Sequence, residues 1–440
     1  MVRDAQGHDL SNATARAAED IDAGARAYSL AYGDPVAHFD AAREAAPDCA
    51  MAQIGKAWLL VMSNDPAGVA SAVGAVERIR TLAMNERERA HFAAIEHAAA
   101  GRWASAVVIL DRHLMRYPFD LMAHQTVMRL DSFLGRFHLA AARSSRALPL
   151  WSKDMPSYGI LYSFYGFGLE ELGDYARAEE VSREAAELEP YGYWPHHAVS
   201  HVLEMTGRPS DGLTWMAERE PLWCGKANTN RVHIHWHKAL FHIELGDYEA
   251  ALALLDGPIR STLRPVGTSL CNATALLWRL EMLGFEPGDR WQDYARLWQA
   301  RANGATSVFN DIHAALTLLK AGDDDGFAAL RRGMLETASA GTEQSPAWRE
   351  LGLPVVDGLS AFVKGDYAKA VELLLGSRFS LARMGGSHAQ RDVIEWTLTE
   401  AAVRARQRDV AVALANERSA LRPQSIPNRR FLDAAERLAA

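Results

Sequence analysis

Cysteine is scarce in this sequence and follows no ligand pattern. Only three cysteines occur among 440 residues, Cys49, Cys224 and Cys271, and none belongs to a Cys-x-x-Cys pair. Thiols so few and so widely spaced argue against a disulfide framework and a cysteine-based zinc module. They fit a reducing compartment, and we therefore predict a cytoplasmic protein.

Surplus positive charge and long apolar segments are also missing. The formal net charge of −8 argues against a general nucleic-acid or anionic-membrane surface, because such a surface needs a basic stripe. No run of about 18 apolar residues occurs, so no membrane-spanning helix is predicted. The polar start MVRDAQGHDLSN lacks the apolar segment of a secretory signal. We expect neither nucleic acid nor a membrane as a partner.

Strand signals are nearly absent as well. The chain has few alternating runs of β-branched residues, and no Asn-Gly or Asp-Gly turn separates such runs. Hydrophobic residues make up 49% of the chain and recur at helical spacing, with Ala, Leu, Glu and Arg filling the windows. The sequence therefore predicts an all-α fold with a sizeable core.

A short motif recurs along the chain and predicts how these helices are joined. The triplet Gly-Asp-Tyr occurs at residues 173–175, 246–248 and 365–367. In each copy an alanine follows the tyrosine after three residues. Two looser copies, GRWASA and GRFHLA, have their aromatic residue at Trp103 and Phe137. This pattern is typical of the turn between the two helices of a tetratricopeptide repeat, where glycine permits the bend and alanine allows close helix crossing.

Other residues fit the same repeat. Pro118 and Pro190 close two copies, and Gly166 and Gly358 fall at the small position of a first helix. We predict a right-handed solenoid of about eight helical hairpins that forms one domain over residues 11–440, with residues 1–10 disordered. The segment LRPQSIPNRRF is expected to be a loop before a short last helix.

Histidine is concentrated in one part of the array. Seven of the 16 histidines lie between His196 and His242. When Pro209 is placed at the turn, His197, His201 and Glu204 take positions 5, 9 and 12 of a first helix, the face that lines the concave groove. In the next unit His233 and His237 take positions 2 and 6. Each helix thus directs two imidazoles, one turn apart, toward the groove.

Three interpretations of these histidines stay open. Pairs of imidazoles one helical turn apart are suited to bind one metal ion, with Glu204 one turn further on. Hydrogen-bonded imidazoles without metal perform acid–base chemistry equally well. The third interpretation is that they make ordinary packing contacts in a half-buried helix.

Four segments resemble, in order and spacing, the tetratricopeptide repeat protein 38 family. They are WPHHAVSHVLEM, RVHIHWHKALFHIELGDYEAAL, VFNDIHAALTLL and GGSHAQRDVIEW, within a similarity that covers nearly the whole chain. The resemblance implies an α-helical repeat fold and carries no established activity. His388 stands where relatives can carry asparagine, which argues against a role for it. The matching signature positions are His197, His201, Glu204, His233, Trp236, His237, Phe309, Asn310, Asp311, His313, Gly385, Gly386, Gln390, Arg391 and Asp392.

The segments VFNDIHAALTLL and GGSHAQRDVIEW also predict local features from their residues alone. Asn310 or Asp311 is expected to cap a helix, while Asp311 and His313 are candidates to orient an imidazole or bind a metal. The glycine pair at 385–386 precedes a helix that we expect Ser387 to cap. Arg391 in its first turn is a candidate to hold an anion or to form a salt bridge between hairpins.

Two functions follow from this pattern. The first is a small-molecule-binding protein or enzyme whose groove closes into a pocket, with zinc, iron or manganese as the candidate metal. Its metal ligands would be His197, His201, His233, His237 and His313, its catalytic groups Glu204, His201 and Asp311, and its ligand-binding residues Trp236, Asn310, Gln390, Arg391 and Asp392. The alternative is a scaffold that binds a peptide in an open groove. The oligomeric state, including a homodimer, stays open.

Overall fold

The computed structural model describes residues 2–264 and 266–438 of the chain. Helices form almost all of its regular structure, as the composition predicted. Contacts between residues divide the chain into two compact units, and the prediction of one domain over residues 11–440 stays a prediction. Unit 1 comprises residues 1–199 and 221–230, and unit 2 comprises residues 200–220 and 231–440. Each unit is described by itself.

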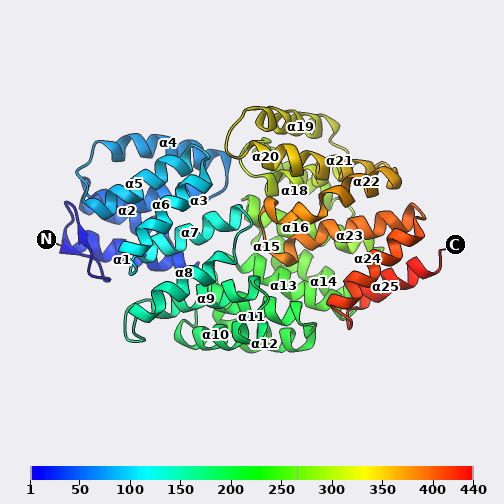
Figure 1. Ribbon diagram of the computed structural model, residues 1–440, viewed down its shortest axis with the longest axis horizontal. Coiled ribbons are helices and arrows are strands. Elements are labelled where there is room, and N and C mark those ends of the chain that lie inside the picture. The colour runs from blue at the N-terminus through cyan, green and yellow to red at the C-terminus, as the bar shows by residue number, and fades with distance from the viewer. Residues whose placement is uncertain (1, 265, 439–440) are drawn as a thin grey trace. The chain divides into compact units, whose positions relative to one another are not determined.

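Unit 1 begins with a short hairpin and continues as antiparallel helix pairs (Figure 1). The pairs α1/α2, α3/α4, α5/α6 and α9/α10 pack side by side around an apolar core. Its elements are β1 (Val2–Arg3), β2 (Asp9–Leu10), α1 (Ala15–Leu30), α2 (Pro35–Ala45), α3 (Ala50–Met62), α4 (Pro66–Arg80), α5 (Glu86–Ala99), α6 (Trp103–Arg116), α7 (Leu121–Phe133), α8 (Leu139–Ala147), η1 (Leu148–Leu150), α9 (Tyr158–Glu171), α10 (Tyr175–Leu188) and the beginning of α11 (Tyr193–Met205).

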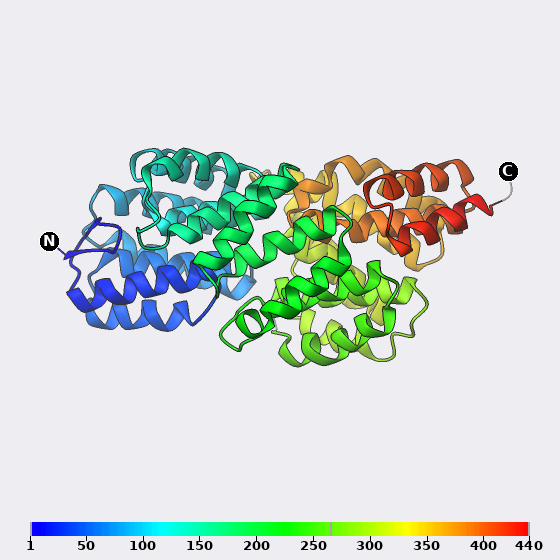
Figure 2. The ribbon, with the colours of Figure 1, turned by 90° about the horizontal axis from the view of Figure 1, so that it is seen from below.

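Unit 2 repeats the arrangement from green to red in Figure 2, with pairs such as α13/α14, α18/α19 and α21/α22 around a second core. Its elements are the rest of α11, most of α12 (Pro209–Trp223), α13 (Arg231–Glu244), α14 (Tyr248–Leu254), η2 (Leu255–Ile259), α15 (Arg260–Thr262), α16 (Gly267–Met282), α17 (Arg290–Trp298), α18 (Val308–Ala321), α19 (Asp324–Ser339), α20 (Ser345–Ala347), η3 (Trp348–Gly352), α21 (Leu353–Val363), α22 (Tyr367–Ser377), η4 (Arg378–Met384), α23 (His388–Arg404), α24 (Arg408–Leu421) and α25 (Ile426–Glu436).

The repeated turns have the backbone that the motif predicted. Gly173, Gly246 and Gly365 have φ angles of 81°, 77° and 83°, in the left-handed region that favours glycine. The alanines that follow them, at 178, 251 and 370, are fully buried where two helices meet. The repeat motif therefore marks true helix–turn–helix units.

The chain ends differ from the expectation. Residues 2–10, expected to be disordered, form the β1–β2 hairpin, with Leu10 buried. The Asp4 carboxylate accepts a hydrogen bond from the His8 backbone N–H and lies 2.9 Å from the Arg87 guanidinium, which fixes the hairpin on α5. Near the other end, α24 extends to Leu421 and α25 begins at Ile426, so the predicted loop is short.

Close helix packing in unit 1 makes Gly168 of α9 sensitive to substitution. A β-carbon at this position would lie 2.1 Å from the backbone nitrogen of Ala141 in α8, and backbone cannot move aside as a side chain does. We expect Gly168→Ala to lower the free energy of unfolding by about 1–3 kcal/mol in urea denaturation. Gly74→Ala in α4 is the control. Its β-carbon meets only the end of Arg78 at 4.0 Å, so helix propensity should leave stability unchanged or raise it by up to ~1 kcal/mol. Equal losses in both variants would contradict the packing argument.

Candidate metal centre

Helices α11 and α13 carry the two predicted histidine pairs. Helix α11 passes from unit 1 into unit 2 after Val199 as one continuous helix, so His197 keeps its place one turn before His201. Helix α13 places His233 and His237 one turn apart. It packs on α16, which brings Asn272 beside His233.

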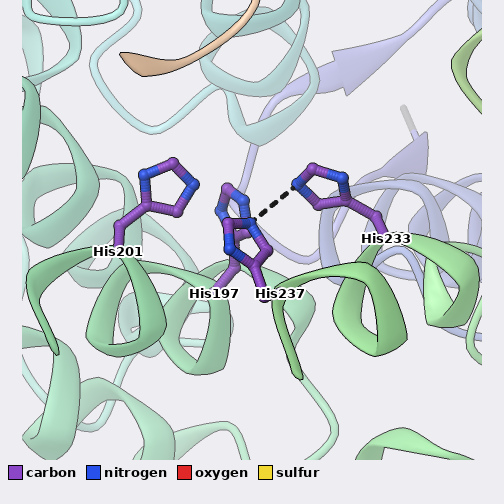
Figure 3. Close-up of side chains that lie close together, drawn as sticks. All are labelled: His197, His201, His233 and His237. Carbon is purple, nitrogen blue, oxygen red and sulfur yellow. Dashed lines mark hydrogen bonds between the residues drawn. The ribbon is translucent and has the colours of Figure 1, made fainter. Parts of the chain in front are cut away.

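Three imidazoles of unit 2 lie close enough to share one ion. His201, His233 and His237 each offer a ring nitrogen, and these nitrogens lie within 4.8 Å of one another, while His197 lies one helical turn before His201 on α11. Figure 3 shows the four rings, with the hydrogen-bond contact between His233 and His237 dashed. Within unit 2, the rings of His201 and His237 have centroids 4.6 Å apart. His201 and His237 are fully buried, and His233 is half-buried. We call these four residues the histidine cluster.

Outer hydrogen bonds decide which nitrogens of the cluster carry protons. The Nδ1 of His237 lies 3.3 Å from Oε2 of Glu204, and the Nδ1 of His233 lies 3.0 Å from Oδ1 of Asn272. Both oxygens accept, so each Nδ1 donates and each neutral ring keeps its lone pair on Nε2. Yet the two Nε2 atoms are 3.1 Å apart. Two lone pairs at this distance repel unless a proton or a metal ion lies between them.

The charge state of the cluster also suits a metal. Burial lowers the pKa of His237 well below its ordinary value, and the neighbouring His201 acts in the same direction. Burial raises the pKa of Glu204, whereas the Arg422 guanidinium, 3.4 Å away, opposes that rise. A neutral imidazole that donates its second N–H to a carboxylate or amide oxygen is the usual form of a metal-binding histidine.

Trp236, expected from sequence as a pocket wall, packs against two rings of the cluster. Its ring is fully buried, stacks on His233 with centroids 5.2 Å apart, and meets His237 edge-on at 4.9 Å. These contacts restrict rotation of both imidazoles. Trp236 therefore helps to fix the direction of their Nε2 atoms.

A second group of metal-compatible side chains lies in unit 1 and was not predicted from sequence. The carboxylate of Asp120, at the start of α7, lies 3.0 Å from Nε2 of both His91 and His113. Trp58 donates its indole N–H to Nδ1 of His91 at 3.1 Å, so the proton of His91 is on Nε2 and points at Asp120. A metal on Nε2 would push that proton to Nδ1, against the indole N–H. We therefore interpret this triad as a structural hydrogen-bond network, in which the Arg87 guanidinium also pairs with Asp120 at 2.6 Å.

No local signal could have revealed the triad. His91 lies in α5, His113 in α6 and Asp120 before α7, so no helical spacing links them. Asp120 also accepts a hydrogen bond from the Ala123 backbone N–H, and from sequence it is an ordinary cap.

The residues predicted near position 310 have other partners. Ser307, not Asn310 or Asp311, caps α18, so that prediction was wrong: the chain enters the helix three residues earlier than expected. Asp311 accepts hydrogen bonds from the Gly304 backbone N–H and the Trp348 indole, and burial raises its pKa to about 7. His313 donates Nδ1–H to the Phe309 carbonyl, and burial lowers its pKa to about 4. Among the residues that the structure describes, none of the metal-compatible groups includes Asp311 or His313.

The predicted glycine-pair loop is present, and the polar residues that follow it each have different hydrogen-bond or ion-pair partners. Ser387 caps α23 as predicted, and Gln390 completes the capping box by accepting a hydrogen bond from the Ser387 backbone N–H. Arg391 donates to the Gly386 carbonyl and contacts Nδ1 of His388. Asp392 pairs with Arg418 at 2.7 Å, and this strong ion pairing lowers its pKa against the effect of burial. Gln390 and Asp392 therefore have structural partners of their own.

No helix among residues 2–264 and 266–438 is both long and apolar enough to cross a bilayer.

Comparisons with known proteins extend the description of the fold. No family model matches the sequence. Among solved structures, a monomeric IFIT1 mutant with Gppp-AAAA is 12% identical, with a TM-score of 0.44 over 96% of this chain and 95% of that one. A human IFIT1 dimer with m7Gppp-AAAA is 13% identical, with a TM-score of 0.43 over the same shares of the two chains. The APC/C hetero-tetramer Cut9-Hcn1 is 12% identical, with a TM-score of 0.35 over 96% and 90%. These likenesses carry no information on function. The chain is a tetratricopeptide-repeat-like helical protein, and its resemblance to the protein 38 family stays a prediction.

Proposed function

We propose that this protein is metal-dependent and that the histidine cluster is its metal centre. His201, His233 and His237 of unit 2 would bind the ion, with His197, one turn before His201, as the fourth ligand. The single observation that carries the proposal is the 3.1 Å approach of two Nε2 atoms whose protons are held on the far side of each ring. A divalent cation removes the repulsion between them.

The donor set narrows the choice of metal. All four groups are imidazoles, which suit zinc, iron, copper and nickel, whereas manganese prefers oxygen ligands. Of the three metals expected from sequence, zinc and iron therefore fit better than manganese. When bound, such an ion polarises a substrate oxygen or activates a water molecule. Glu204 accepts the Nδ1–H of His237 and so would orient a ligand, and its role as a proton carrier, expected from sequence, stays a prediction.

Metal analysis of protein purified without chelator tests this proposal. We expect about one equivalent of zinc or iron per chain, and a melting temperature that falls when a chelator removes it. A ligand present at about 1,000 times its Kd adds ~4 kcal/mol to the free energy of unfolding, so the shift is easily measured. Less than about a tenth of an equivalent of any transition metal, together with no shift after incubation with excess zinc, would leave the peptide-binding scaffold as the better hypothesis.

Glu204 allows a sharper test because its carboxylate accepts the Nδ1–H of His237 and is not itself one of the proposed metal ligands. We expect Glu204→Gln to weaken zinc binding by about 10–100-fold, the usual effect of losing an outer hydrogen-bond partner. The reason is that a neutral amide polarises the imidazole less than a carboxylate does. Competition with a chromophoric chelator measures the affinity.

Glu244→Gln is the matched control for this variant. Glu244 also lies beside Arg422, at 3.6 Å from the same guanidinium nitrogen as Glu204, but it is not a hydrogen-bond partner of His237. Zinc affinity should stay at the wild-type value. An equal loss in both variants would assign the effect to the Arg422 ion pairs and not to the metal centre.

A further inference from the structure

Unit 2 contains a cavity that is lined by neither pair of cluster histidines. It has a volume of about 300 Å³, the size of a small-molecule site, and it lies between η4, the beginning of α23 and the end of α24. Glu204 reaches its wall, whereas none of the four cluster histidines does. The cavity is therefore separate from the histidine cluster.

The charged wall of the cavity has spare hydrogen-bond donors. Arg422 pairs through Nη1 and Nη2 with Glu204 and Asp392, and Arg378 pairs through Nε and Nη2 with Glu395 and Glu417. A guanidinium has five N–H groups. Among contacts between the described residues, Nη1 of Arg378 and Nε of Arg422 have no acceptor. Both guanidiniums line the cavity.

The carboxylates on the same wall are already paired with cations. Both oxygens of Asp392 accept hydrogen bonds from Arg418, and one also accepts from Arg422. Glu204 is held by Arg422 and His237, and Glu395 by Arg378. A cationic ligand would compete with the arginines for these carboxylates, whereas a ligand that accepts hydrogen bonds would use the unengaged N–H groups. The polar wall thus favours an anion.

The mouth of the cavity is apolar and unusually exposed. Phe379 is 91% exposed and Leu421 is 69% exposed, and both line the cavity together with the buried Leu381. The Arg378 guanidinium lies over the Phe379 ring, 5.0 Å from its centroid. Exposed apolar side chains that gather in one patch, unlike singly scattered ones, can mark a ligand-binding groove. The body of the ligand is therefore expected to be apolar.

We propose that this cavity binds a small organic carboxylate with an aromatic or aliphatic body. The carboxylate pairs with Arg378 and Arg422, and the body covers Phe379 and Leu421. This proposal does not rest on the metal centre, although Glu204 touches both sites. Of these four residues, none was expected to form a site from the sequence.

Benzoate is a suitable probe, with benzylammonium and benzamide as matched cationic and neutral compounds. The full-length protein, treated with chelator and dialysed, is titrated with each compound by calorimetry or ligand-observed NMR. We expect benzoate to bind with a Kd of about 1 mM or lower, and the other two compounds to bind at least about tenfold more weakly. Inorganic phosphate, used as a fourth probe, shows whether the apolar body is needed. If phosphate binds as tightly as benzoate, the site is a general anion site and the proposal is wrong.

Three variants locate the binding. Arg378→Gln should weaken benzoate binding by about tenfold or more, and Phe379→Ala should weaken it by a smaller factor. Phe379 is so exposed that its loss should not disturb the fold. Arg383→Gln is the control, since this exposed arginine of η4 pairs with Glu350 outside the cavity. A loss that is equal in Arg383→Gln, or equal binding of benzylammonium, overturns the proposal.

His237→Ala separates this proposal from the metal centre. The variant lacks a cluster ligand but keeps the cavity wall, so its affinity for benzoate should match that of metal-free wild-type protein. Retained benzoate binding in a protein that never binds metal would support the cavity while refuting the proposed metal function. Metal binding without benzoate binding would do the reverse.

Discussion

Replacing His237 with alanine is expected to weaken zinc binding by more than about 100-fold, since losing an outer partner alone costs about 10–100-fold. His237 contacts both neighbours in its unit: its Nε2 is 3.1 Å from that of His233, and its ring lies 4.6 Å from that of His201. Cobalt(II) serves as a spectroscopic substitute, and loss of its visible absorption in the variant would report loss of the site.

His242→Ala provides the control for this measurement. His242 lies on the same helix, α13, but it pairs with Asp247 at the surface, 3.0 Å away. Its replacement should leave both the cobalt spectrum and the zinc affinity unchanged. If His237→Ala lowered the melting temperature of the metal-free protein strongly but left the zinc affinity intact, the cluster would be a packing feature and not a metal centre.

The largest effect on stability is expected at the unit 1 triad. Asp120→Ala would remove one of the two carboxylates that pair with the Arg87 guanidinium, which is almost fully buried; the lost oxygen lies 2.6 Å from it. It would also remove the acceptor of two buried imidazole N–H groups. Removing one partner of a buried ion pair typically costs about 3–5 kcal/mol. Urea denaturation at neutral pH should show a loss of that order, with the change confined to unit 1.

The same loss should depend on pH with a definite sign. Burial tends to raise the pKa of Asp120, but Arg87 and the two imidazole N–H groups outweigh it, so the folded-state pKa lies well below 3.8. A carboxylate with a lowered pKa contributes stability that is present above its unfolded-state value and is lost as the pH falls toward the folded-state value. The difference in the free energy of unfolding between wild type and Asp120→Ala should therefore be constant from neutral pH down to about pH 5. It should shrink once the pH falls below the ordinary pKa of an aspartate.

Asp34→Ala is the matched control for both experiments. Asp34 also caps a helix of unit 1, since its carboxylate accepts the Ala37 backbone N–H at 3.0 Å, but it is exposed. Losing such a cap costs about 1 kcal/mol. If Asp120→Ala were no more destabilising than Asp34→Ala, Asp120 would stabilise the protein only as a helix cap. The buried hydrogen-bond network would then make no measurable contribution to the free energy of unfolding.

Local features of the fold were predictable because their physical causes are local. A glycine in the left-handed region, an aromatic after it and an alanine at the helix crossing act within one hairpin, so Gly173, Ala178 and their equivalents identified the turns. The one-turn spacing of His233 and His237 likewise follows from helix geometry alone. The N-terminal hairpin was missed, because its anchor is the contact of Asp4 with Arg87, far along the chain.

The sequence by itself determined an all-α repeat fold and two helices that each carry a pair of imidazoles on one face. Only the tertiary structure decided what those faces meet. It placed Asn272 beside Nδ1 of His233 and Glu204 beside Nδ1 of His237. It made Asp311 the hydrogen-bond acceptor of the Trp348 indole, and it brought His91 and His113 to the same carboxylate, that of Asp120. The physical reason is that periodicity sets the direction of a side chain from its own helix. The partner it meets there depends on how separate hairpins pack, which no local pattern encodes.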